Sequence, residues 1–127
     1  MNKEHTEKLL KDFPDLYKQY YWPMQQTCMC WGFDISDGWF KLIYDLSKNI
    51  VKINPKCEAC QVKEKFGGLR FYVDHGDEVT HNLISQAEDD SLKICEVCGL
   101  PGELNDIGWM SVKCEMHKKE TEHAKRK

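Results

Sequence analysis

The residues in this sequence best suited to chemistry are three cysteines and one histidine near the end of the chain. Their spacing is C-x2-C, then fifteen further residues, then C-x2-H, and the four residues are Cys95, Cys98, Cys114 and His117. Three thiolates and one imidazole complete a tetrahedral zinc site. Because four protein ligands leave no position for water, the pattern predicts one structural zinc and no catalysis by that metal.

The residues around these ligands predict how they are positioned. Gly99 allows the backbone to turn back toward the first two thiolates, and residues 103–112 predict a short hairpin. Cys114 and His117 would begin a final helix, where residues three apart share one face. A knuckle followed by a hairpin and a helix resembles the treble-clef zinc fingers. That resemblance covers residues 95–124 and implies a zinc-binding subdomain there.

The remaining cysteines allow two interpretations. Cys57 and Cys60, together with Cys28 and Cys30, offer four thiolates for a second metal site, and ordinary buried thiols are the alternative. Seven cysteines in total, with metal-ligand spacing among them, favour a reducing compartment over a disulfide framework. The first residues lack an apolar signal segment, and no apolar run approaches the roughly 20 residues that cross a bilayer. We therefore expect a cytoplasmic protein without membrane contact.

Helices and one hairpin must position these groups. Apolar periodicity predicts helices over residues 3–13, 39–53 and 78–92, a further helical turn over 15–20, and an aromatic-rich loop over 22–37. Ser36 or Asp37 would cap the helix that starts at Trp39, and Pro55 would stop it. Residues 61–73 predict a hairpin with Gly67 and Gly68 as its turn. The expected fold class is α+β: a small antiparallel sheet packed with helices in one domain spanning 1–127.

Alternation along this hairpin predicts one apolar face and one basic face. Val62, Phe66, Leu69, Phe71 and Val73 would point inward, with Glu64 as an irregular member of that face. Lys63, Lys65, Arg70 and Tyr72 would point outward, with Lys65 directly opposite Arg70. Two cations facing each other repel, so an anion should offset them. Asp34, Asp37 or Glu88 of the same chain could supply it, and so could a bound anionic small molecule or partner surface.

Aromatic residues of the loop extend this predicted surface. Trp31, Phe33, Trp39 and Phe40 flank an acidic turn containing Asp37, and core packing is the alternative to a stacking surface. The residues we assign to partner or ligand binding are Lys63, Lys65, Arg70, Tyr72, Trp31, Asp37 and Trp39. Residues 118–127 carry five Lys or Arg against two Glu, a basic tail that could contact nucleic acid or only increase solubility.

No catalytic motif supports an enzyme. The chain lacks GxSxG, GxxxxGK[ST], HExxH and the zinc-deaminase signature. The near balance of 18 Lys and Arg against 21 Asp and Glu also provides no overall field for nucleic acid.

The segments WGFDISDGWF, QVKEKFGGLRFYV and CEVCGLPG, with the Trp, Cys and His that follow, resemble a family of small bacteriophage and prophage proteins. The sequence departs from the family pattern at Ile35, where a Cys is expected, and by adding Cys57 and Cys60. The resemblance implies an accessory protein in the cytoplasm of a bacterial host cell. It would bind a host defence protein or sequester an anionic nucleotide signal. A nucleic-acid-binding zinc finger is the first alternative, and an enzyme is the second.

Overall fold

The computed structural model describes residues 1–105 and 110–117 and confirms the expected α+β class. Its elements, in chain order, are α1 (Lys3–Asp12), the 3-10 turns η1 (Lys18–Tyr21) and η2 (Met29–Trp31), β1 (Phe33–Asp34), η3 (Asp37–Trp39), α2 (Phe40–Ile53), β2 (Glu58–Lys65), β3 (Gly68–Asp74), α3 (Glu78–Ser91), β4 (Glu103–Asn105) and β5 (Ser111–Lys113). The predicted hairpin over 103–112 is confirmed as β4 and β5. Residues 115–117 are helical, and the predicted remainder of that last helix lies outside the described residues.

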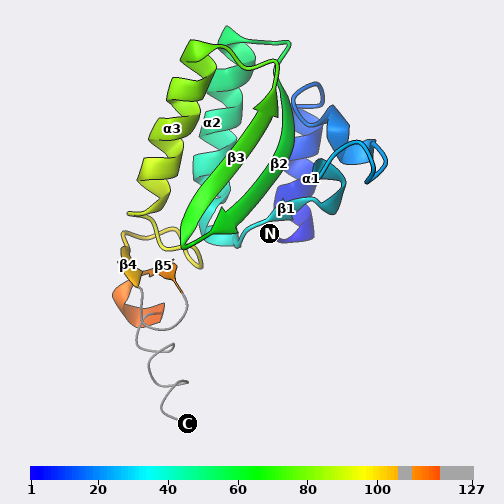
Figure 1. The fold of residues 1–127 in the computed structure, drawn as a ribbon. Helices are drawn as coiled ribbons and strands as arrows, with labels where there is room; N and C mark the ends of the chain where they lie inside the picture. Colours follow the sequence, from blue (N-terminus) through cyan, green and yellow to red (C-terminus); the bar gives the residue numbers. More distant parts are fainter. Residues whose placement is uncertain (106–109, 118–127) are drawn as a thin grey trace.

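A three-stranded sheet forms the centre of the fold. Its order is β1-β2-β3, with β1 parallel to β2 and β2 antiparallel to β3. Figure 1 shows α2 and α3 side by side behind the sheet, with α1 beyond its β2 side. The sequence pattern missed β1, because a strand of two residues is too short to show alternation.

The core lies between this sheet and α2. Ile43, Leu46 and Ile50 recur at helical spacing on α2 and are buried, as expected for an amphipathic helix. From the sheet, Val62, Leu69 and Phe71 are buried, and residues of α1 and the following loop complete the cluster. On α3, Ile84 and Ala87 are buried, whereas Val79 is 56% exposed.

The register of the β2–β3 hairpin differs from the predicted one. Phe66 and Gly67 form the turn, with φ values of 54° and 84°, and Lys65 pairs with Gly68. Arg70 is therefore opposite Lys63, and the prediction of Lys65 in that place is wrong. A shift of two residues leaves every side chain on its original face, so alternation cannot distinguish the two registers. Phe66, predicted inward, is 65% exposed at the turn.

Side chains of α3 accept hydrogen bonds from the free edge of β3. Ser91 Oγ accepts from the backbone N–H of Leu69 at 3.0 Å, and Glu88 Oε2 accepts from that of Phe71 at 3.1 Å. An unpaired strand edge is a template for pairing with another chain, and these contacts occupy it. Glu88 is thus engaged at the strand edge.

Glu64 points inward, as the alternation predicted, and its carboxylate has a local partner. Its Oε1 accepts the backbone N–H of Gly67 at 2.7 Å, which satisfies a donor of the turn.

None of the helices in the described part of the chain is long and apolar enough to cross a membrane.

Candidate metal centre

The four predicted zinc ligands lie together. One ligand atom from each of Cys95, Cys98, Cys114 and His117 falls within 4.8 Å of all the others. The Nδ1 atom of His117 is 3.1 Å from Cys114 Sγ and 3.4 Å from Cys95 Sγ, so this nitrogen is the one directed at the thiols. Cys98 Sγ lies 3.7 Å from Cys114 Sγ. These distances fit four donors around one metal ion.

Backbone hydrogen bonds shape the first half of the centre into a knuckle, defined here as residues 95–99. Gly99 has φ of 80°, and its N–H donates to the carbonyl of Cys95 at 2.9 Å. The N–H of Cys95 donates to the carbonyl of Leu100 at 2.7 Å, and a bridge joins Ile94 to Pro101. The chain therefore reverses directly after Cys98, as the glycine predicted.

The surroundings of the sulfurs favour negative charge on Cys95. Burial raises the pKa of this thiol, but hydrogen bonds from the backbone of Cys114, Cys98 and Val97 outweigh burial and lower the pKa to about 6. For Cys98, the backbone of Leu100 lowers the pKa, whereas burial and the sulfurs of Cys95 and Cys114 raise it, with a net increase. The fold thus stabilises the thiolate of Cys95. A bound cation would offset the repulsion between neighbouring sulfurs that disfavours the thiolate of Cys98.

The knuckle packs against the backbone at the start of α2. The N–H of Gly38 donates to the carbonyl of Glu96 at 2.8 Å, and the indole Nε1 of Trp39 donates to the carbonyl of Ile94 at 2.9 Å. A Cβ placed on Gly38 would lie 2.2 Å from the carbonyl oxygen of Cys95. Only a glycine allows this approach, so the DGW segment positions the metal centre.

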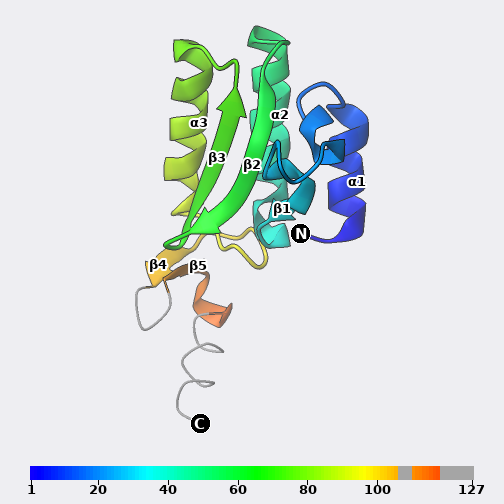
Figure 2. The same cartoon turned by 45° about the vertical axis from the view of Figure 1, so that its right-hand side comes forward.

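The second half of the centre packs against the β2–β3 turn. A Cβ on Gly67 would lie 2.6 Å from Leu104 Cδ1 of β4 and 3.2 Å from the backbone nitrogen of Ser111. The backbone N–H of Glu96 donates to the carbonyl of Val112 in β5, which joins this hairpin to the knuckle. Figure 2 shows β4 and β5 directly below the turn of the larger hairpin. This contact needs the turn at Phe66 and Gly67, which explains the observed register.

The other cysteines do not form a second cluster of this kind. Among the described residues, the only group of three or more His, Cys, Asp or Glu suited to a metal is the one above. Cys57 is buried, Cys30 and Cys60 are partly buried, and Cys28 is exposed. Burial, then Asp77 and Asp74, raise the pKa of Cys57 to about 11, and burial also raises that of Cys60. Cys57 and Cys60 are therefore protonated thiols at neutral pH.

The outward side of the hairpin carries the predicted cations. We call Gln61, Lys63, Lys65, Arg70 and Tyr72 the outer face; all are exposed or partly buried. Within residues 1–105 and 110–117, no carboxylate lies within ion-pair distance of Lys63, Lys65 or Arg70. Among the described residues, Arg70 donates only to the neighbouring carbonyl of Leu69, at 3.1 Å. Lys65 lies over the ring of Phe66. Asp34 is paired with Lys63 by strand register but makes no ion pair with it.

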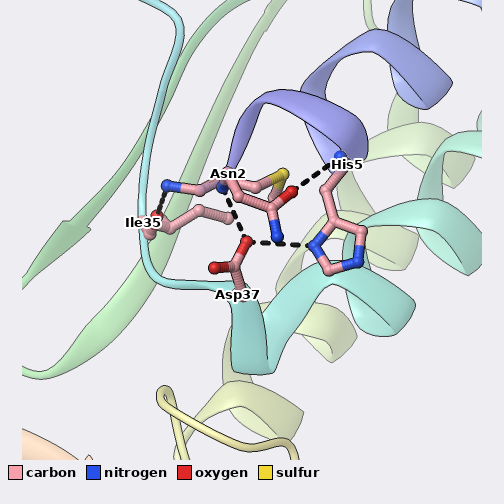
Figure 3. Close-up of polar contacts among 5 residues, drawn as sticks. Asn2, His5, Ile35 and Asp37 are labelled. Atoms are coloured by element: carbon pink, nitrogen blue, oxygen red, sulfur yellow. Dashed lines mark hydrogen bonds and ion pairs between the residues drawn. The ribbon is translucent and has the colours of Figure 1, made fainter.

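Asp37 and Trp39, both predicted to join the binding surface, have other roles. Trp39 is fully buried, so its assignment as a wall of that surface is wrong. The Oδ1 atom of Asp37 accepts from the backbone N–H of Asn2 at 2.7 Å and lies 3.0 Å from His5 Nδ1 (Figure 3). It therefore holds α1 to the start of α2. The predicted cap is also wrong, because α2 has Trp39 at its N-cap and no side-chain cap.

Several residues of the site were not predicted from the sequence. His5 stacks on Phe40 with ring centroids 3.9 Å apart while its Nδ1 contacts Asp37. The backbone N–H of Asn2 donates to the same Asp37 carboxylate. The N-terminal amine donates to the carbonyl of Ile35 (Figure 3). Sequence spacing could not predict that Asn2 and His5 contact Asp37, because these residues are more than thirty positions apart. The glycine of the DGW triplet before the helix was the one local sign of the close approach at Gly38.

Comparison with protein-family models, with curated proteins and with solved structures found no match. The function of this chain must therefore be inferred from the chemistry of the metal centre and of the outer face.

Proposed function

We propose that this chain is a zinc-binding protein that acts by binding a partner, with the metal holding its shape and the outer face making the contact. Two properties of the metal centre support the first part. Three sulfurs and one imidazole nitrogen are the donors that zinc prefers at structural sites. The four donors form a closed set, so the metal would have no position for substrate.

The observation that carries the second part is the opposed pair Lys63 and Arg70. The two residues face each other across β2 and β3, and neither forms an ion pair within the described part of the chain. Like charges directly opposite destabilise a strand pair by a few tenths to about 1 kcal/mol. Glu88 and Asp37, which could have neutralised them, bind backbone N–H groups elsewhere. Asp34 lies beside Lys63 in the strand register but forms no ion pair with it, so an external anion is a further source of compensation.

The setting we propose is the cytoplasm of a bacterial cell, on the basis of the resemblance to small phage and prophage proteins. In that setting the partner is a host defence protein, or the ligand is an anionic nucleotide signal. Both supply the carboxylates or phosphates that a guanidinium and an ammonium group bind through charge-assisted hydrogen bonds.

Ligand-induced stabilisation tests the outer face even while the partner is unidentified. Anions that bind only the folded chain raise its melting temperature. We expect ATP or polyglutamate to raise that of the zinc-loaded protein by several degrees, and to have little effect on Lys63→Ala/Arg70→Ala. Lys48→Ala, at an exposed position on α2, is the control and should respond as the wild type does. An equal response of all three proteins would refute the proposal.

Nucleic acid is the second candidate, favoured by the exposed rings of Trp31 and Tyr72 near these cations. Its affinity would fall steeply between low and moderate salt, because each phosphate contact releases counterions. A binding constant for an oligonucleotide that changes little with salt would exclude this candidate.

A further inference from the structure

A loop beside the sheet exposes large apolar side chains. We call residues 20–31 the aromatic loop. Tyr21 is 74% exposed, Trp31 is 72% exposed and Met24 is 62% exposed, whereas Trp22 is 38% exposed. Four such side chains within one short segment form an apolar surface of the kind that marks an interaction site.

The aromatic loop is ordered by buried residues. Met29 is fully buried, and Thr27, on the same loop, is 8% exposed. Thr27 Oγ1 donates to Gln19 Oε1 at 2.7 Å, and Gln19, itself buried, donates to Asp74 Oδ2 at 2.7 Å. Turns closed by hydrogen bonds from Gln26 to Pro23 and from Trp31 to Cys28 fix the backbone. The backbone that carries the exposed rings is therefore ordered before any partner binds, which lowers the entropic cost of binding.

The aromatic loop lies next to the outer face. Thr27 Oγ1 also contacts the carbonyl of Cys60 in β2, and Figure 2 shows this segment in front of α1 beside β2. Because β1 is parallel to β2 with Phe33 opposite Val62, Trp31 precedes the paired residues on the side of Cys60. The next strand pair along is Gln61 with Tyr72, followed by Lys63 with Arg70. Trp31 thus precedes β1 near the part of β2 that carries Gln61. The two cations lie two positions beyond Gln61 and Tyr72 on the outer face, where residues rise about 3.3 Å each and strands lie about 4.8 Å apart.

We propose that the aromatic loop and the outer face form one continuous surface, and that this surface binds an acidic, apolar patch on a partner protein. The inference rests on the proposed binding function and identifies its partner class. Trp, Tyr and Arg are the residues that most often dominate the energy of protein interfaces, and Met is also enriched there. The unpaired Lys63 and Arg70 require carboxylates on the partner beside its apolar groups.

Two other occupants fit the surface less well. The regularly spaced phosphates of a nucleic-acid backbone along this region would meet Asp34, which is paired with Lys63 by strand register. A second copy of this chain, related by two-fold symmetry, would place the same apolar and cationic patch against itself, which brings like charges together. A partner protein avoids both conflicts, because its carboxylates can lie at Lys63 and Arg70 and away from Asp34.

Peptide selection on the intact, zinc-loaded chain tests the proposal. We expect a random displayed peptide library to yield binders that combine Asp or Glu with aromatic or aliphatic residues. Isothermal titration of the synthesised consensus peptide should show at least about a tenfold loss of affinity for Trp31→Ala and for Arg70→Ala. Val79→Ala removes an exposed apolar side chain from α3 and should bind as the wild type does. The exposed position of Trp31 leaves the folding of its variant unchanged.

Four results would overturn the inference. The first is a peptide selection that yields no acidic peptide whose binding depends on Trp31. The second is a consensus peptide whose affinity decreases in Arg70→Ala but not in Trp31→Ala. In the second case binding at the outer face stands while the role of the aromatic loop does not. The third is binding of oligo(dT) that is lost in Trp31→Ala, and the fourth is sedimentation as a dimer that Trp31→Ala dissociates. If no probe responds to Arg70→Ala, the proposed function fails as well.

Discussion

The sheet with its helices and the metal end are held together in different ways. Residues 1–94 contribute the large, fully buried side chains, among them Trp39, Tyr17 and Leu16. In the described part of the metal end, the buried apolar groups are Val112 and two of the sulfur ligands. Apolar burial stabilises the first region at about 25 cal/mol per Å² removed from water. The second region has little of it, and a metal ion bound by the four donors would supply the missing stability.

The two regions meet through close backbone contacts and through Val112, which belongs to the same apolar cluster as the sheet and its helices. Gly38 touches the knuckle, and Gly67 touches β4 and β5. The contact at Gly38 tolerates no added atom, because the backbone of Cys95 and Glu96 cannot move aside as a flexible side chain can. The sheet and its helices therefore determine where the four candidate ligands lie, and we expect a bound metal ion to hold them together.

Removal of a metal ligand should have the largest effect. Structural zinc contributes about 10 to 16 kcal/mol in finger peptides, which is comparable to the stability of a whole domain. We expect the purified wild type to carry one zinc per chain and Cys98→Ser to lose it, with the metal end unfolded. Native mass spectrometry and amide NMR spectra measure the two effects. Unaltered metal content in the variant would contradict the assignment.

Acid should release the same metal. Protons compete with zinc for thiolates, so affinity falls as pH decreases through the range in which Cys95, with a pKa of about 6, takes up a proton. We expect release of zinc to a colorimetric chelator to increase as the pH is lowered from 7 to 5. Release that does not depend on pH would show that thiolates are not the ligands.

Gly38→Ala tests the connection between the two regions. The new methyl group would lie 2.2 Å from the carbonyl oxygen of Cys95, so the knuckle must move. We expect a loss of about 3 kcal/mol in unfolding free energy, at the upper end for overpacking, and weaker zinc binding. Urea unfolding and a zinc competition assay measure these.

Gly68→Ala is the matched control for that substitution. Its methyl group would meet the side chains of Leu92 at 3.3 Å and Arg70 at 3.5 Å, both of which can adjust. We expect a loss of less than about 1 kcal/mol and unchanged zinc affinity. Equal effects of the two substitutions would show that Gly38 does not position the metal centre.

Tyr17→Phe should weaken only the sheet-and-helix region. The hydroxyl of Tyr17 is buried and hydrogen bonded to Ser47 Oγ, which also donates to the carbonyl of Ile43. Loss of one such bond costs about 1 kcal/mol, because Ser47 keeps its other partner. Urea unfolding should report that loss, whereas zinc affinity should remain unchanged. A decrease in zinc affinity would show that the two regions are coupled through the core.

The smallest effect is expected at the buried thiol of Cys57. With a pKa of about 11, about a thousandth of it is thiolate at pH 8, and burial also restricts access. Iodoacetamide should therefore modify exposed Cys28 well before Cys57, as peptide mass spectrometry can show. Rapid labelling of Cys57 in the zinc-loaded protein would indicate that this region opens.

Particular residues show why some predictions succeeded. The four metal ligands were identified because their types and short spacings carry the chemistry directly. The helix Phe40–Ile53 was identified from the recurrence of apolar residues at helical spacing, although its cap was assigned wrongly. The inward set of Val62, Leu69 and Phe71 was correct because alternation depends only on parity.

The amino-acid sequence by itself determined the ligand set, the main helices and which hairpin side chains share a face, since each depends on residues close together in the chain. Tertiary structure decided the hairpin register, because Gly67 must meet Leu104 and Ser111 and alternation allows either turn. It also decided that Asp37 binds His5 and Asn2 and that Trp39 is core. A local sequence pattern cannot predict which residues distant in the sequence will contact each other. The energies of such contacts arise only once the helices and strands have packed together.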